Sequence, residues 1–298
     1  MRVRLNSVPI HYSGPHDWPI LWRFTIPAVL GGAMVPPVNW VCVALLVNSA
    51  GGYGAMGLFN AANQWRNLLM FIPGIMMQAA LPMMSAAHSN GETTPDFQRT
   101  LKMAQSLIVA AAFPAAAILM FGSGVILHLY GRGFSGGESV IIGLVATTLI
   151  QCIGAATGTA IEARGKMWMG LLLNSSWAAV YLGFVYLTVN QLGANALAYG
   201  LLVAYTVLAV WGFVYLKPRL PLPEGLFKQL QISVGLALVL VVVALICTPT
   251  LRLIVLVPVT VLTTLLVFAT VVDKEFIRVA IGAETREANA ESEVAGVC

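Results

Sequence analysis

Residues 55–86 read AMGLFNAANQWRNLLMFIPGIMMQAALPMMSA, an apolar run long enough to cross a bilayer, with an arginine near its middle. About 20 apolar residues span the hydrocarbon core of a membrane. A guanidinium at that depth costs roughly 2.5–3.5 kcal/mol on insertion scales, so such residues usually face a bundle interior or a water-filled cavity. Arg66 is therefore the strongest indication of function in this sequence, and it favours a hydrated path for a polar, anionic cargo.

The rest of the chain is similarly apolar. Of its 298 residues 58% are hydrophobic and only 9% are charged, whereas a soluble domain carries about 25% charged residues. Applying the same length criterion gives seven further segments, at 18–48, 101–129, 138–162, 167–190, 193–216, 228–248 and 251–272. We therefore predict an all-α, polytopic transmembrane helix bundle of about eight helices.

Prolines and composition divide this bundle. Pro36 and Pro37 lie in the middle of the first segment and should kink or break its helix, since proline lacks an N–H and clashes with the preceding turn. A proline-rich stretch, PRLPLPEG at 218–225, separates six helices from a Val- and Leu-rich final pair. The predicted organisation is an N-terminal segment, a six-helix transporter lobe, a terminal transmembrane helix pair and a polar tail, at 1–17, 18–217, 218–272 and 273–298.

The basic residues predict the orientation in the membrane. Twelve of the 16 lysines and arginines fall on one side of this arrangement, and only Arg132 and Arg252 fall on the other. The cytoplasmic side of membrane proteins collects such residues, so we expect an integral plasma (inner) membrane protein with both termini in the cytoplasm. The basic residues are dispersed over segment ends, so no nucleic-acid partner is expected.

Four amides surround Arg66. Asn60, Asn63, Gln64 and Asn67 follow i, i+3, i+4, i+7 spacing and share one helical face, which Arg66 borders. One interpretation is the wall of a translocation cavity in which Arg66 holds a phosphate or carboxylate. The alternative is hydrogen bonding between helices, with Arg66 reaching out to the membrane surface.

Three further residues are candidates for substrate binding. Arg23, at the start of the first segment, suits either a lipid-phosphate anchor or a cavity mouth, and Asn39 follows the expected proline break. Gln151 shares a face with Thr147, although the small residues around it, such as the Gly154–Gly158 pair, favour helix packing.

Other chemistries find little support. The acidic residues near the segments, Asp17, Glu138, Glu162 and Asp273, all lie at segment ends, which weakens a cation-coupled mechanism within this chain. The four cysteines have no metal-ligand or disulfide spacing. No catalytic or nucleotide-binding motif is present, so we expect a protein that is not an enzyme and needs neither a metal nor a cofactor.

Several short patterns, taken in order, resemble the polysaccharide and lipid-linked oligosaccharide flippases of the multidrug and oligosaccharidyl-lipid exporter superfamily. They are Phe24-Thr25-Ile26-Pro27, GLFNAANQW at 57–65, LPMMS at 81–85, YGRGF at 130–134, EARGK at 162–166 and LGANALAYG at 192–200. Members of this family have two six-helix lobes around a central cavity, often followed by two extra helices. This chain resembles the second lobe plus the extra pair.

The resemblance implies a function. It implies that an isoprenoid-linked glycan is flipped between leaflets by alternating access, with Arg66 drawing the pyrophosphate and the amides bonding sugar hydroxyls. Because one lobe cannot enclose a cavity, we expect a truncated chain, a half-transporter that pairs with a second lobe or itself, or a degenerate remnant. The alternatives are one half of a cation-coupled multidrug efflux carrier and a non-transporting scaffold subunit of a glycan-assembly complex.

Overall fold

The computed structural model describes residues 21–87, 95–134, 136–217 and 225–271. The predicted N-terminal segment, the tail and most of the proline-rich stretch lie outside these ranges. The described residues form helices η2 (Leu21–Thr25), α2 (Ile26–Ala33), α3 (Val35–Val47), α4 (Gly52–Ala87), α5 (Pro95–Phe121), α6 (Ser123–Tyr130), η3 (Arg132–Phe134), α7 (Glu138–Ala163), α8 (Met167–Leu192), α9 (Ala194–Leu216), α10 (Leu226–Ile246) and α11 (Pro249–Thr270). Within these ranges eight helical spans are long and apolar enough to cross a membrane, which confirms the predicted fold class.

Two of the predicted segments are interrupted helices. The first breaks at Met34, between α2 and α3, so that Pro36 and Pro37 fall in the first turn of α3. Proline is tolerated there because the N–H that it lacks would have no partner inside the helix. The break near the proline pair is therefore confirmed. The third predicted segment, 101–129, is two helices, because α5 ends at Phe121 and α6 begins at Ser123.

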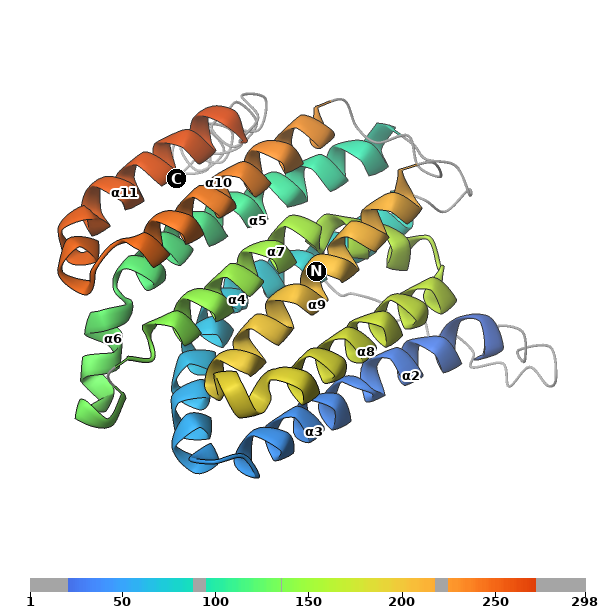
Figure 1. Ribbon diagram of the computed structural model, residues 1–298. Helices are drawn as coiled ribbons and strands as arrows, with labels where there is room; N and C mark the ends of the chain where they lie inside the picture. The colour runs from blue at the N-terminus through green and yellow to red at the C-terminus, as the bar shows by residue number, and fades with distance from the viewer. Residues whose placement is uncertain (1–20, 88–94, 135, 218–224, 272–298) are drawn as a thin grey trace, which may run out of the picture.

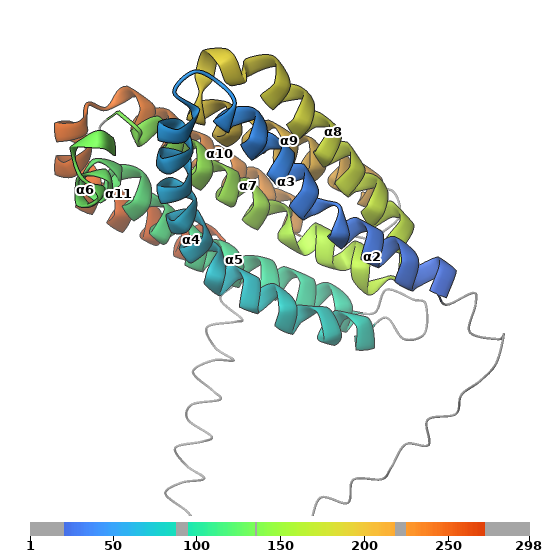
Figure 2. The ribbon, with the colours of Figure 1, turned by 90° about the horizontal axis from the view of Figure 1, so that it is seen from below.

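The helices lie side by side in a row, with α7 near the centre. Figure 1 shows α2 and α3 at one edge, followed by α8, α9 and α7, with α10 and α11 at the opposite edge. Helices α4 and α5 cover the far side of α7, and Figure 2 shows α5 and the second half of α4 running below α7, α8 and α9. Contacts of α7 with α4, α5, α9 and α10 make it the central helix of the molecule.

Small residues bring α7 and its neighbours close together. A Cβ added to Gly143 would lie 3.1 Å from the ring of Tyr199, and one added to Gly154 would lie 3.4 Å from the Cβ of Ala209. In lipid there is no hydrophobic force between helices, so close approach of backbones provides much of the attraction. Gly193 alone connects α8 to α9, with a φ of 53° that favours glycine.

Helices α10 and α11 are held to α5 and α7 by polar contacts at both ends of the pair. At one end the guanidinium of Arg252 on α11 donates to the carboxylate of Glu138 on α7. At the other, the side-chain amide of Gln229 on α10 donates to Ser106 of α5 over 2.9 Å. Ser106 Oγ also lies 3.2 Å from the carbonyl oxygen of Val271, just after α11. Helices α10 and α11 therefore pack as part of the same bundle.

Candidate functional site

Arg66 connects two central helices. From near the middle of α4 its guanidinium donates to the side-chain oxygen of Gln151 on α7 over 2.9 Å. It also donates to the side-chain oxygen of Asn63, one turn earlier on α4, over 3.3 Å. Its Nε is buried and has no hydrogen-bond partner in the described structure. Arginine carries five N–H donors in a planar fork, so this side chain is fixed in place yet retains donors for a further acceptor.

A tyrosine that the sequence did not indicate completes the cluster. Tyr205 of α9 lies beside both Arg66 and Gln151. Three helices, α4, α7 and α9, thus each contribute polar side chains at one point inside an apolar bundle. A tyrosine in an apolar helix is usually explained by packing alone, so only the spatial arrangement identifies it.

The amide face of α4 divides in two. Asn63 is half-buried and bonds Arg66, whereas Asn60, Gln64 and Asn67 are exposed on the surface of the lobe. Gln64 accepts a long hydrogen bond of 3.4 Å from the hydroxyl of Tyr130, at the end of α6. Polar side chains exposed at membrane depth are costly in lipid, so this face is suited to a hydrated cavity or to another protein surface.

Among the described residues, neither Arg23 nor Asn39 forms a hydrogen bond with this cluster. Arg23 is exposed in η2, and the side-chain amide of Asn39 donates to the carbonyl oxygen of Val35 over 2.9 Å, near the helix break. Thr147, which shares a face with Gln151, is buried and bonds the carbonyl of Gly143 in its own helix. The structure therefore brings together Arg66, Asn63 and Gln151, and leaves Arg23 and Asn39 outside the group.

A cavity of about 180 Å³, the interior pocket, begins beside the Arg66 cluster. Gln151 and Tyr205 line one end of it, and Glu162, near the end of α7, lines the other. Between them lie small or flexible side chains of α4, α7 and α9: Met70, Met77, Gly154, Ala155, Gly158 and Ala209. The pocket is large enough for several water molecules, since a water occupies about 30 Å³ in the liquid.

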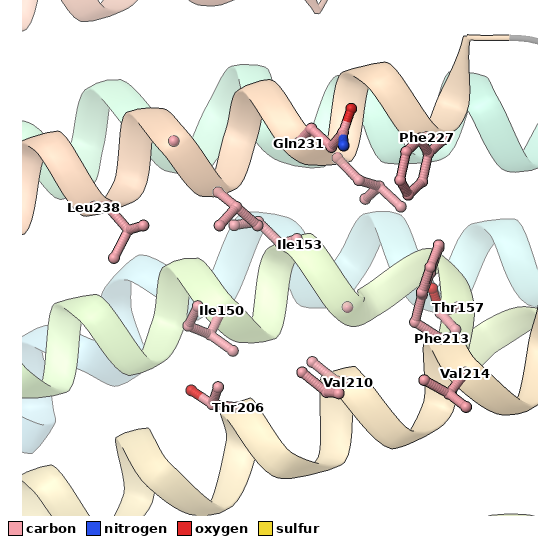
Figure 3. Close-up of a pocket in the computed structure, with 15 residues that line it drawn as sticks. Ile150, Ile153, Thr157, Thr206, Val210, Phe213, Val214, Phe227, Gln231 and Leu238 are labelled. Carbon is pink, nitrogen blue, oxygen red and sulfur yellow. The ribbon is translucent and has the colours of Figure 1, made fainter.

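A second cavity, the lateral groove, lies on the other side of the α7–α9 contact. It has a volume of about 510 Å³, and Figure 3 shows side chains of α7, α9 and α10 converging on it. The lining is almost entirely apolar: Ile150, Ile153, Val210, Val214, Leu230, Val234 and Leu238, with the stacked rings of Phe213 and Phe227 at one end. Only Gln231, Thr157 and Thr206 add polar atoms. Such a groove fits a hydrocarbon chain.

The sequence is similar to those of known polysaccharide export proteins. No protein-family model matches the chain. It is 25% identical over 191 residues to the EPS I polysaccharide export inner membrane protein EpsE of Ralstonia nicotianae, across 63% of this chain and 43% of the relative. The corresponding protein of Ralstonia solanacearum is 24% identical over 202 residues, 67% of this chain and 46% of the relative.

A solved structure shares the fold. The lipid II flippase MurJ, in an inward closed conformation, aligns with a TM-score of 0.60 and 14% identity over 90% of this chain and 55% of that protein. The predicted resemblance to the polysaccharide and lipid-linked flippase family is confirmed. The chain is an integral, multi-pass inner-membrane protein, and it spans about half the length of the relatives that it matches. Those relatives are named for export and flipping rather than for catalysis.

Proposed function

We propose that this chain forms one lobe of a transporter that moves a lipid-linked polysaccharide precursor across the inner membrane by alternating access. The observation that carries the proposal is Arg66, a guanidinium fixed between α4 and α7 with a buried, unpartnered Nε. The names of the relatives support transport over a scaffold or a drug-efflux role.

The cargo has three chemically different parts, and each has a matching surface. The pyrophosphate would bind Arg66, because guanidinium groups recognise phosphate oxygens through paired N–H donors. The sugar hydroxyls would bond Asn60, Gln64 and Asn67, which are exposed beside Arg66 on α4. The isoprenoid chain would occupy the lateral groove, whose lining of α7, α9 and α10 side chains is apolar.

A second lobe would complete the cavity. The exposed face of α4 carries the three amides together with Leu68, Phe71 and Ile75, which are 53–65% exposed. This mixture suits a surface that alternately contacts a partner lobe and hydrated cargo. The partner is either another part of the same polypeptide or a separate chain.

The proposed topology places both termini, and the α7–α8 turn at residues 164–166, in the cytoplasm, as the distribution of lysine and arginine predicts. The turns before α4 and between α10 and α11 then face outward. Labelling of single cysteines introduced at Lys166 and at Thr250 with an impermeant reagent tests this arrangement. Labelling of position 166 from outside intact cells would reverse it.

The direct test of cargo binding replaces Arg66 in the producing cells. Arg66→Ala should lower surface polysaccharide by about tenfold or more, since hydrogen bonds to charged groups contribute about 1.5–3 kcal/mol. Arg66→Lys keeps the charge but loses the paired N–H donors of the guanidinium. Its surface polysaccharide should lie between that of Arg66→Ala and that of the native chain. Arg23→Ala, an exposed arginine in the same chain, is the matched control and should export normally. Normal export by Arg66→Ala at normal abundance would contradict the proposal.

A further inference from the structure

Glu162 lines two cavities at once. One is the interior pocket that leads to Gln151 and Tyr205. The other, the turn cleft, has a volume of about 550 Å³ and lies between Phe24 of η2, the last two turns of α4 and the α7–α8 turn. Figure 2 shows this end of the molecule, where α2 diverges from α4 and α5. Glu162 is the one residue that the linings of these two cavities share among the described residues.

The two cavities and the Arg66 cluster lie along one stripe of α7. Gln151, Ala155, Gly158 and Glu162 are spaced by three or four residues, so they occupy one helical face. At 1.5 Å per residue, Glu162 and Gln151 are about 16 Å apart along the helix axis. Gly158 widens the middle of this route, since a Cβ there would meet no atom within 4 Å.

The electrostatic setting of Glu162 is unusual for a structural residue. It is the second-last residue of α7, where the negative end of the helix dipole disfavours a carboxylate. Among the described residues its side chain has no hydrogen bond and no ion pair. Across the two cavities the charged or titratable side chains are Glu162, Arg164 and Tyr205, while α4 and η2 contribute only uncharged ones.

We propose that the Glu162 carboxylate forms a charge-selective constriction, the neck, between the turn cleft and the interior pocket. It admits water and small cations and excludes small anions. This role rests on the proposed function, because it gives Arg66 two separate approaches. The anionic cargo reaches Arg66 from the exposed amide face of α4, and cations and water reach it through the interior pocket. The selectivity itself does not depend on transport.

Cysteine chemistry tests the neck without measuring export. The test places Gly158→Cys in a chain carrying Cys247→Ser and Cys298→Ser, with the buried Cys42 and Cys152 retained. Vesicles that expose the α7–α8 turn receive methanethiosulfonate reagents of similar size bearing either a trimethylammonium or a sulfonate group. The cationic reagent should modify the introduced thiol about three- to tenfold faster than the anionic one, since this thiol and the Glu162 carboxylate lie one helical turn apart.

Variants of Glu162 isolate its charge. Glu162→Gln should bring the ratio of the two rates close to that of a free thiol, and Glu162→Asp should preserve the selectivity. The thiol of a Val210→Cys variant, in the lateral groove, should react with neither charged reagent and reports any loss of the fold. The same ratio in Glu162→Gln, or no reaction of the Gly158→Cys thiol with either reagent, would overturn the proposal. Either result would leave the Arg66 export test unaffected.

Discussion

The two ends of α7 carry glutamates in opposite settings. Glu138 in the first turn accepts a hydrogen bond from Arg252, a residue only 8% exposed, and the pair joins the terminal helices to the lobe. Glu162 in the last turn contacts two cavities and has no ion-pair partner among the described residues. The sequence alone treats both as carboxylates at the ends of a transmembrane segment. The difference indicates that one end of the helix is fixed while the other is accessible.

Charge reversal should produce the largest effect at the fixed end. Arg252→Glu places two carboxylates together in a largely buried site, and breaking a buried pair costs about 3–5 kcal/mol. The double variant Glu138→Arg with Arg252→Glu should recover most of that loss. Thermal unfolding in detergent, followed by the fraction that elutes as a single species, measures both.

The accessible end supplies the control for this prediction. Glu162→Arg should change the free energy of unfolding by no more than about 0.5 kcal/mol, as is usual for surface positions. If Glu162→Arg destabilised the protein as much as Arg252→Glu, the contrast between the two ends of α7 would be wrong.

Polar attachment at the other end of the terminal pair should have a smaller effect. Ser106→Ala leaves the buried side-chain amide of Gln229 without its acceptor, and interhelical hydrogen bonds in membranes average about 0.6 kcal/mol with a maximum near 1.7. Thr206→Ala, an exposed threonine that bonds only its own helix, is the comparison. Chemical unfolding of both variants should separate them by about 1 kcal/mol, and equal midpoints would argue against this attachment.

Alanine substitutions at two glycines test the packing of the same two halves of α7. Gly143→Ala must displace Tyr199, whose ring would lie 3.1 Å from the new Cβ, and overpacking costs about 1–3 kcal/mol. Gly158→Ala meets open space and should be neutral or slightly stabilising, because alanine favours helices by about 0.5–1 kcal/mol over glycine. The difference in melting temperature tests this pair, and a more stable Gly143→Ala variant would contradict it.

Much of this fold could be predicted from the lengths of the apolar runs. The segment at 138–162 became Glu138–Ala163, and the segment at 228–248 became Leu226–Ile246. Lipid imposes this regularity, because each span must bury its backbone polar groups within one helix. The split of the third segment at Gly122 was not predicted, since one glycine in an apolar run does not distinguish a turn from a helical position.

The site was only partly predictable for a related reason. Helical spacing placed Asn63 next to Arg66, because contacts between residues three positions apart are local. Gln151 was a candidate, yet its bond to Arg66 spans 85 residues of sequence and depends on how α4 and α7 cross. Arg252 was interpreted as one of two basic residues on the outer side, whereas it is largely buried against Glu138. Tyr205 carried no signal in the sequence.

The central claim is that this lobe takes part in moving a lipid-linked precursor between leaflets. The most direct measurement is the fraction of that precursor exposed on the outer leaflet of the inner membrane, in producing cells with the native chain and with Arg66→Ala at equal abundance. We expect the precursor to accumulate on the inner leaflet in the variant and its exposed fraction to fall about tenfold, in line with the loss of a charged hydrogen bond. An unchanged distribution between the leaflets would contradict this claim.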